Sequence, residues 1–312
     1  MNYTEHRYTS HDHLSLYYRE YGQGEQTIIC LPGLTRNSKD FHEIATHLAG
    51  HYRVLCLDLR GRGQSDRDPK WKNYHPGTYV KDTWKLLDER GIDSIIILGT
   101  SLGGLMAMIM AEQQPERVEA IVLNDIGPAI DPVGYARILA YAGRSKPVAT
   151  WEDAAQQCRE TYAVAIPDQP MTFWQEYAQQ SFSADKNGLP VTDADPNIGE
   201  AIRNSVNLTK WLVRFRKWGI LKKVAGVMID PWDSFRAVSM PCLVIRGGIS
   251  DILSEEIIDD MQAIKPDLMR ATIPIRGHVP LLDETESLQA IDTFLAGLPA
   301  KQVESNLPDQ SE

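Results

Sequence analysis

Two hydrophobic patterns alternate along the chain. Short, almost continuous apolar runs predict buried strands, and segments with apolar residues every three or four positions predict amphipathic helices. Leu14–Tyr18 fits one strand of an N-terminal hairpin. The predicted buried strands are Thr27–Leu31, Tyr52–Leu59, Ile95–Leu98, Val118–Leu123, Cys242–Arg246 and Leu268–Ile273.

The predicted helices lie between these strands. Phe41, Ile44, Ala45 and Leu48 share one helical face, and the segment from Ser101 to Ile109 is apolar almost all round, as in a buried helix. Strands that alternate with helices indicate an α/β protein with a mostly parallel central sheet and helices on both faces. Further helices are predicted around Val80–Leu87, Ser254–Ile264 and Leu288–Leu295.

The pattern changes between residues 128 and 236, where strand signals vanish and helix-like segments are broken by prolines. We interpret this stretch as a helical cap inserted into a core made of residues 1–127 and 237–300, with 301–312 as a flexible tail. Five of the seven tryptophans fall in the predicted cap. Trp151, Trp174 and Trp211 are candidates for lining a substrate pocket, although packing inside the cap is the favoured interpretation for any one of them.

The chemical signal that stands out is Gly99-Thr100-Ser101-Leu102-Gly103, a G-x-S-x-G sequence directly after a predicted strand and at the start of a helix. A nucleophilic serine needs to stand exposed on a tight strand-to-helix turn, where glycines leave room for close backbone contacts. Ser101 is therefore the predicted nucleophile.

A serine of this kind needs a base and an acid that orients the base. His278 is the one histidine after Ser101 in the sequence and follows the last predicted strand, so we predict that it is the base. Asp251, after the strand that ends near Arg246, is the preferred acid. Asp125, which follows the strand after the elbow helix, is the alternative, because both loops meet at the same edge of a parallel sheet.

An oxyanion formed at the ester carbonyl requires two hydrogen-bond donors. The backbone N–H of Leu102, next to the nucleophile, is one predicted donor. The other is expected from the turn after Thr27–Leu31, and we choose Leu34 in Pro32-Gly33-Leu34.

Together these motifs resemble the α/β-hydrolase superfamily, in its cap-bearing branch of serine esterases, lactonases and carbon–carbon bond hydrolases. The resemblance also covers the stretch from Asp58 to Ser65 and spans nearly the whole chain outside the predicted cap. It implies the α/β-hydrolase fold and a Ser-His-Asp triad. Relatives often have His-Gly where this chain has Leu31-Pro32-Gly33, and the dehalogenases and epoxide hydrolases of the superfamily use aspartate as nucleophile.

Composition narrows the remaining choices. The 312 residues carry a net charge of -10 with no basic stripe, so nucleic acid is not an expected partner. No apolar run is long enough for a membrane span or a signal peptide, and the four cysteines lack disulfide-like or metal-like spacing, so we predict a cytoplasmic location. No dinucleotide, Walker or zinc motif is complete, so we predict no metal and no cofactor.

The predicted function is hydrolysis of a small-molecule carboxylic ester through an acyl-enzyme. Carbon–carbon bond hydrolysis or enol-lactone hydrolysis with the same triad is the main alternative. A cofactor-free peroxidase-like activity and a binding protein of hydrolase shape are further alternatives. The substrate, its chain length and the oligomeric state stay open at the level of sequence.

Overall fold

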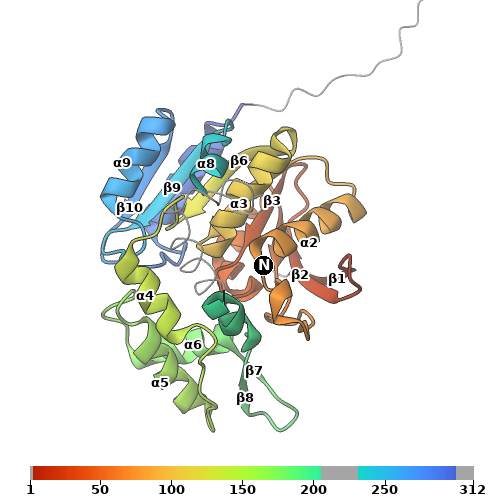
Figure 1. The fold of residues 1–312 in the computed structure, drawn as a ribbon, viewed down its shortest axis with the longest axis vertical. Coiled ribbons are helices and arrows are strands. Elements are labelled where there is room, and N and C mark those ends of the chain that lie inside the picture. Colours follow the sequence, from red (N-terminus) through yellow and green to blue (C-terminus); the bar gives the residue numbers. More distant parts are fainter. Residues whose placement is uncertain (1–2, 205–230, 300–312) are drawn as a thin grey trace, which may run out of the picture.

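An eight-stranded, mostly parallel sheet forms the centre of the structure, a computed structural model that describes residues 3–204 and 231–299 (Figure 1). The strand order is β1-β2-β4-β3-β5-β6-β9-β10, and β2 runs antiparallel to both of its neighbours. The strands are β1 (Thr4–Thr9), β2 (Ser15–Tyr21), β3 (Thr27–Leu31), β4 (Arg53–Leu57), β5 (Ile95–Thr100), β6 (Val118–Asn124), β9 (Cys242–Gly247) and β10 (Met269–Ile273).

Helices cover both faces of this sheet. One apolar cluster joins it to α1 and α10, and another joins it to α2, α3, α8 and α9, so β3, β5 and β6 are buried on both sides. No described helix has the length and apolar character needed to cross a bilayer. The helices of this layer are α1 (His42–Leu48), α2 (Pro76–Glu89), α3 (Leu102–Gln113), α8 (Pro231–Arg236), α9 (Glu255–Ile264) and α10 (Thr285–Ala296).

Residues 132–204 form a separate group of elements, here called the cap segment, beside the carboxyl ends of the strands (Figure 1). It has its own apolar cluster around Trp174. Its helices are α4 (Pro132–Tyr141), α5 (Trp151–Tyr162) and α6 (Met171–Ser181), and residues 197–204 are also helical. Its antiparallel strand pair is β7 (Phe182–Ala184) and β8 (Pro190–Thr192).

The strand pair is a difference from the all-helical cap that the sequence predicted. Phe182 is buried in the cap cluster, so tertiary packing favours an extended conformation that the short sequence pattern does not signal. The division into core and cap domains stays a prediction. Residues 205–230, with Trp211 and Trp218, and the predicted tail 301–312 lie outside the described residues.

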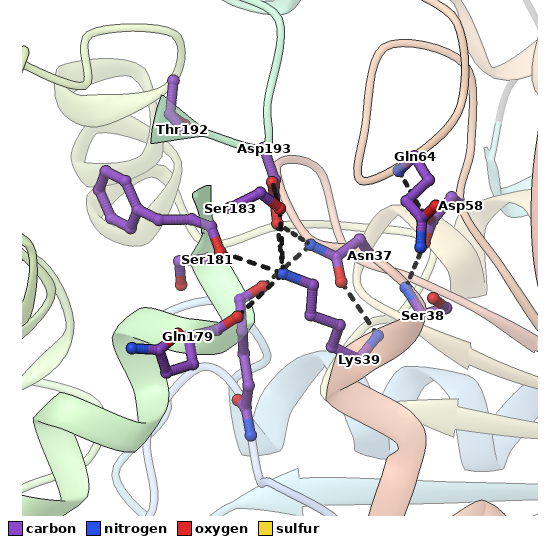
Figure 2. Close-up of polar contacts among 12 residues, drawn as sticks. Asn37, Ser38, Lys39, Asp58, Gln64, Gln179, Ser181, Ser183, Thr192 and Asp193 are labelled. Atoms are coloured by element: carbon purple, nitrogen blue, oxygen red, sulfur yellow. Dashed lines mark hydrogen bonds and ion pairs between the residues drawn. The ribbon is translucent and has the colours of Figure 1, made fainter. Parts of the chain in front are cut away.

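A polar cluster joins the cap segment to the loop after β3 (Figure 2). Lys39 Nζ forms an ion pair with Asp193 Oδ2 at 2.7 Å and also donates to the backbone oxygens of Gln179 and Phe182. Asn37 Nδ2 donates to the same Asp193 oxygen and to the Gln180 backbone oxygen. Because Asp193 is almost completely buried, these donors compensate a desolvated carboxylate.

The same loop is held from the core side by Asp58. Its two carboxylate oxygens accept the backbone N–H groups of Ser38 and Gln64, at 2.7 and 2.8 Å (Figure 2). Burial raises the pKa of Asp58, and these amide donors oppose that rise. The segment from Gly33 to Lys39 is therefore fixed between the sheet and the cap segment.

Candidate active site

Ser101 occupies a strained turn between β5 and α3. Its backbone has φ 52° and ψ -112°, a left-handed conformation that is rare for a non-glycine residue. A Cβ on Gly99 would lie 2.5 Å from the carbonyl group of Gly103, and a Cβ on Gly103 would lie 2.0 Å from the Leu31 oxygen. The glycines of the motif are thus required by close backbone approach, as the sequence predicted.

His278 lies against this serine. Its Nε2 is 2.9 Å from Ser101 Oγ, and its Nδ1 is 2.8 Å from Asp125 Oδ2. Nδ1–H donating to the carboxylate leaves Nε2 free to accept the serine proton. The expected pairing of Ser101 with His278 is therefore present in the geometry.

Asp125 is completely buried and has several donors. Its Oδ1 accepts the Gly247 backbone N–H at 2.9 Å, and its Oδ2 accepts the Ser250 hydroxyl at 2.6 Å as well as His278. The positive φ of 53° turns the backbone directly after β6. These contacts give the carboxylate one orientation, toward the imidazole.

Asp251 is not the partner of His278, so the preferred assignment of the acid is wrong in this structure. Its carboxylate forms a two-point ion pair with Arg137 of α4, at 2.6 and 2.7 Å. The hydrogen bonds from Arg137 lower the pKa of Asp251. The residue lies four positions beyond the end of β9, where the chain has already turned toward the cap segment.

The expected oxyanion donors lie beside the nucleophile. Leu102 is the first residue of α3, so its N–H has no carbonyl partner within the helix. A Cβ placed on Gly33 would be in van der Waals contact with Ser101 Cβ, at 3.9 Å, and Leu34 follows Gly33 in the wall of the same cavity. The Leu34 carbonyl accepts two hydrogen bonds from Arg62, at 3.0 and 2.8 Å.

Arg62 and Asn124 support the site and were not predicted from sequence. The buried Arg62 guanidinium lies 4.6 Å from the Tyr79 ring centroid and fixes the peptide that follows Leu34. Asn124 Nδ2 donates to the Pro280 oxygen at 3.0 Å, which ties the loop that carries His278 to β6. The Asp58-to-Ser65 motif contains Arg62, but only the tertiary contact reveals its role.

A cavity of about 330 Å³ opens onto Ser101 and His278. The described candidate tryptophans do not line it, because Trp151 and Trp174 pack in the cap cluster, and Trp211 lies outside the described residues. Burial raises the pKa of the tyrosines in the cavity wall, which therefore present neutral rings. The aromatic residues that line the cavity include Tyr141, Tyr162, Phe173 and Tyr177.

Arg36 also borders this cavity, but its charge is already compensated. Its guanidinium forms a two-point ion pair with Asp40 and lies 4.4 Å from the Tyr177 ring centroid. It also donates to the Ser181 hydroxyl. Arg36 is thus a structural link between the loop after β3 and the cap segment.

One cluster with metal-like ligands lies away from this cavity. His11, Asp12 and Asp82 bring ligand atoms within 4.8 Å of one another. The buried Arg60 guanidinium donates to both carboxylates, so a side-chain cation already compensates them. The contacts fit a structural ion-pair network.

The family described as "alpha/beta hydrolase fold" matches residues 26–285. The chain belongs to this family, as the fold and the strand–serine–helix turn led us to expect. It is similar to an alpha/beta hydrolase from Novosphingobium aromaticivorans, whose crystal structure shares 37% sequence identity and a TM-score of 0.81 and covers 94% of this chain and 98% of that one.

Two relatives with named activities cover most of the chain. It is 30% identical to the 3-hydroxybutyrate-oligomer hydrolase of Cupriavidus necator, over 90% of this chain and 92% of the relative. It is 23% identical to the 2-(acetamidomethylene)succinate hydrolase of Mesorhizobium japonicum, over 90% and 92%. The fold and these relatives support classification of the protein as a hydrolase.

Proposed function

We propose that the protein hydrolyses carboxylic esters through a triad of Ser101, His278 and Asp125. The observation that carries the proposal is the continuous hydrogen-bond chain from Ser101 Oγ through both imidazole nitrogens to Asp125, with distances of 2.9 and 2.8 Å. Each group has the partner that its role requires: a base beside the nucleophile and a buried carboxylate behind the base.

The reaction proceeds in two acyl transfers. Ser101 Oγ attacks the ester carbonyl while His278 Nε2 takes the serine proton. The C–O bond to the alcohol then breaks, and His278 returns that proton to the leaving oxygen. A water molecule, deprotonated by His278, then attacks the acyl-enzyme. The bond between the acyl carbon and Ser101 Oγ breaks, and His278 gives its proton to Oγ as the acid is released.

The backbone N–H groups of Leu34 and Leu102 hold the negative oxygen during both attacks. The N–H of Leu102 lies at the N-terminus of α3, where the helix dipole is positive. The N–H of Leu34 comes from the loop that Arg62 supports. Donors fixed before the reaction stabilise the transition state without reorganising. This chemistry uses side chains and backbone amides of the chain itself.

We propose oligoesters of short hydroxy acids as the substrate class. The support is the similarity to the 3-hydroxybutyrate-oligomer hydrolase, which covers nine-tenths of both chains. The cavity beside Ser101 is also lined by apolar side chains, including Ile138, Ile166 and Phe173. Such a lining suits the short aliphatic chain of an acyl group.

The test compares wild type with Ser101→Ala on p-nitrophenyl esters from acetate to laurate, together with a lactone and a vinylogous diketone. We expect ester turnover by wild type and a loss of about 10⁴-fold or more in the variant. Turnover of the lactone or diketone without any ester hydrolysis would reject the ester proposal. Undiminished activity of Ser101→Ala would reject the nucleophile.

A further inference from the structure

A second cavity, of about 340 Å³, lies next to the one that contains Ser101. The residues that line both cavities are Thr35, Arg36, Tyr141 and Tyr162, so the two meet along this wall. A ligand that extends from Ser101 past these shared residues has a second cavity to enter.

The far rim of the second cavity is basic. Arg144 and Lys146 line it, both are exposed, and neither forms an ion pair within the described residues. Glu160 is the acidic residue of the described lining, and Gln156 donates to it. Arg36 adds no free charge, because Asp40 compensates it.

The catalytic cavity has an acidic exposed side, here called its mouth. Glu43, Glu176 and Asp283 line it, all three are exposed, and none forms an ion pair within the described part of the chain. An anionic group is thus repelled at this mouth and attracted toward Arg144 and Lys146.

We propose that the second cavity binds the carboxylate end of a hydroxy-acid oligoester whose scissile ester lies at Ser101, with Arg144 and Lys146 facing the carboxylate. The inference rests on the proposed ester hydrolysis and adds a direction to it. Such an oligoester has a hydroxyl at one end and a carboxylate at the other. The hydroxyl-bearing part becomes the acyl group on Ser101, and the carboxylate-bearing part leaves as the alcohol.

This direction is consistent with the chemistry of each step. His278 donates its proton to the alkoxide oxygen of the carboxylate-bearing fragment, which then departs through the second cavity. The neutral, hydroxyl-ended acyl group stays beside the acidic mouth until water releases it. Each cycle consumes one water and yields one acid and one alcohol.

The experiment measures kcat and KM on a linear dimer of 3-hydroxybutyrate and on its terminal primary amide, which has the same size and no charge. The variants are Arg144→Glu/Lys146→Glu and the control Arg159→Glu, an exposed cation of α5 that lines neither cavity. We expect the double variant to raise KM for the dimer about tenfold, with kcat within about twofold.

The amide substrate and the control variant show whether a change in KM comes from the carboxylate charge or from the shape of the site. KM for the amide should change less than about twofold in the double variant, and the control should leave both substrates unchanged. Wild-type preference for the dimer over the amide should fall as salt is raised, because exposed charges are screened. Equal KM values of the two substrates in wild type, or equal shifts in the double variant, would overturn the proposal.

The same data distinguish failure of the carboxylate site from failure of the proposed ester hydrolysis. Turnover of neutral p-nitrophenyl esters with no preference for the charged dimer rejects only the second cavity as a carboxylate site. Absence of turnover on every ester rejects the proposed function.

Discussion

The loops that carry Asp125 and Asp251 leave adjacent strands at the same edge of the sheet, yet they serve different parts of the molecule. Asp125 directly follows β6 and is buried among core donors, including the Gly247 amide and the Ser250 hydroxyl. Asp251 lies beyond β9, is partly exposed, and is paired with Arg137 of the cap segment. Position at the edge of the sheet is therefore insufficient to identify the residue that orients a catalytic base.

Other residues around the site also divide into those that act within the core and those that connect the core to the cap segment. Arg62 and Asn124 hold the loops on either side of Ser101 from within the core. Lys39 and Asp251 instead connect the core to the cap segment. Changes on the core side should therefore reduce the rate of the chemical step, and changes on the cap side should mainly reduce stability.

Among the residues that support Ser101 and His278, the largest effect is expected for Asp125→Asn. The amide preserves size but favours the wrong imidazole tautomer, so kcat should fall by about 10³- to 10⁴-fold. Steady-state kinetics on a p-nitrophenyl ester measure this, with circular dichroism as a check of folding. Activity within tenfold of wild type would show that Asp125 does not orient the base.

A smaller loss of activity is expected for Arg62→Lys. Lysine cannot make the two hydrogen bonds that Arg62 donates to the Leu34 carbonyl, so the position of the Leu34 N–H should become less fixed. We therefore expect kcat to fall about 10- to 100-fold. Arg117→Lys is the matched control, because Arg117 also stacks on an aromatic ring and bonds to backbone oxygens, but away from the site. Equal rates in the two variants would contradict the role of Arg62.

On the cap side, Lys39→Met should destabilise the protein without abolishing chemistry. The substitution leaves the buried Asp193 carboxylate without its cation, which should cost about 2–3 kcal/mol of unfolding free energy. Urea denaturation measures the loss. Lys85→Met, which removes an exposed helical ion pair with Glu89, should cost about 0.3–0.5 kcal/mol. Equal losses of unfolding free energy in the two variants would show that the ion pair of Lys39 is worth no more than an exposed one.

The smallest effect is expected for Asp251→Asn. The ion pair with Arg137 is partly exposed, so its loss should cost about 0.5–1 kcal/mol at pH 7 and change kcat by less than about threefold. Because Arg137 lowers the pKa of Asp251 in the folded state, this stabilisation is present above the ordinary aspartate pKa and is lost as the pH falls through the folded-state value. Thermal unfolding of the variant and wild type should therefore converge in acid, and a constant difference down to pH 2 would contradict the ion pair.

The fold was predictable because its strongest signals are local. The apolar run before Ser101 and the glycines around it predict a strand, a tight turn and a buried helix, and this pattern can be recognised from neighbouring residues alone. His278 was predictable because no other histidine follows Ser101 in the sequence. Both predictions depend only on the order of residues along the chain.

The acid and the pocket walls depend on contacts across more than a hundred residues. Asp125 reaches His278 because of a left-handed backbone turn and two donors, one from the last residue of β9 and one from the loop after it. Asp251 is instead paired with Arg137, 114 positions earlier. The short strands of the cap segment and the tyrosines of the cavity wall likewise follow from packing, which a periodicity pattern does not report.

The most direct test of the account is the proton resonance of His278 Nδ1 in wild type, Asp125→Asn and Asp251→Asn, assigned by ¹⁵N-histidine labelling and by loss in His278→Ala. A proton shared with a buried carboxylate resonates far downfield. We expect this resonance to persist in Asp251→Asn and to move upfield or disappear in Asp125→Asn. Persistence in Asp125→Asn with loss in Asp251→Asn would show that Asp251 is the partner of His278 and would contradict the account.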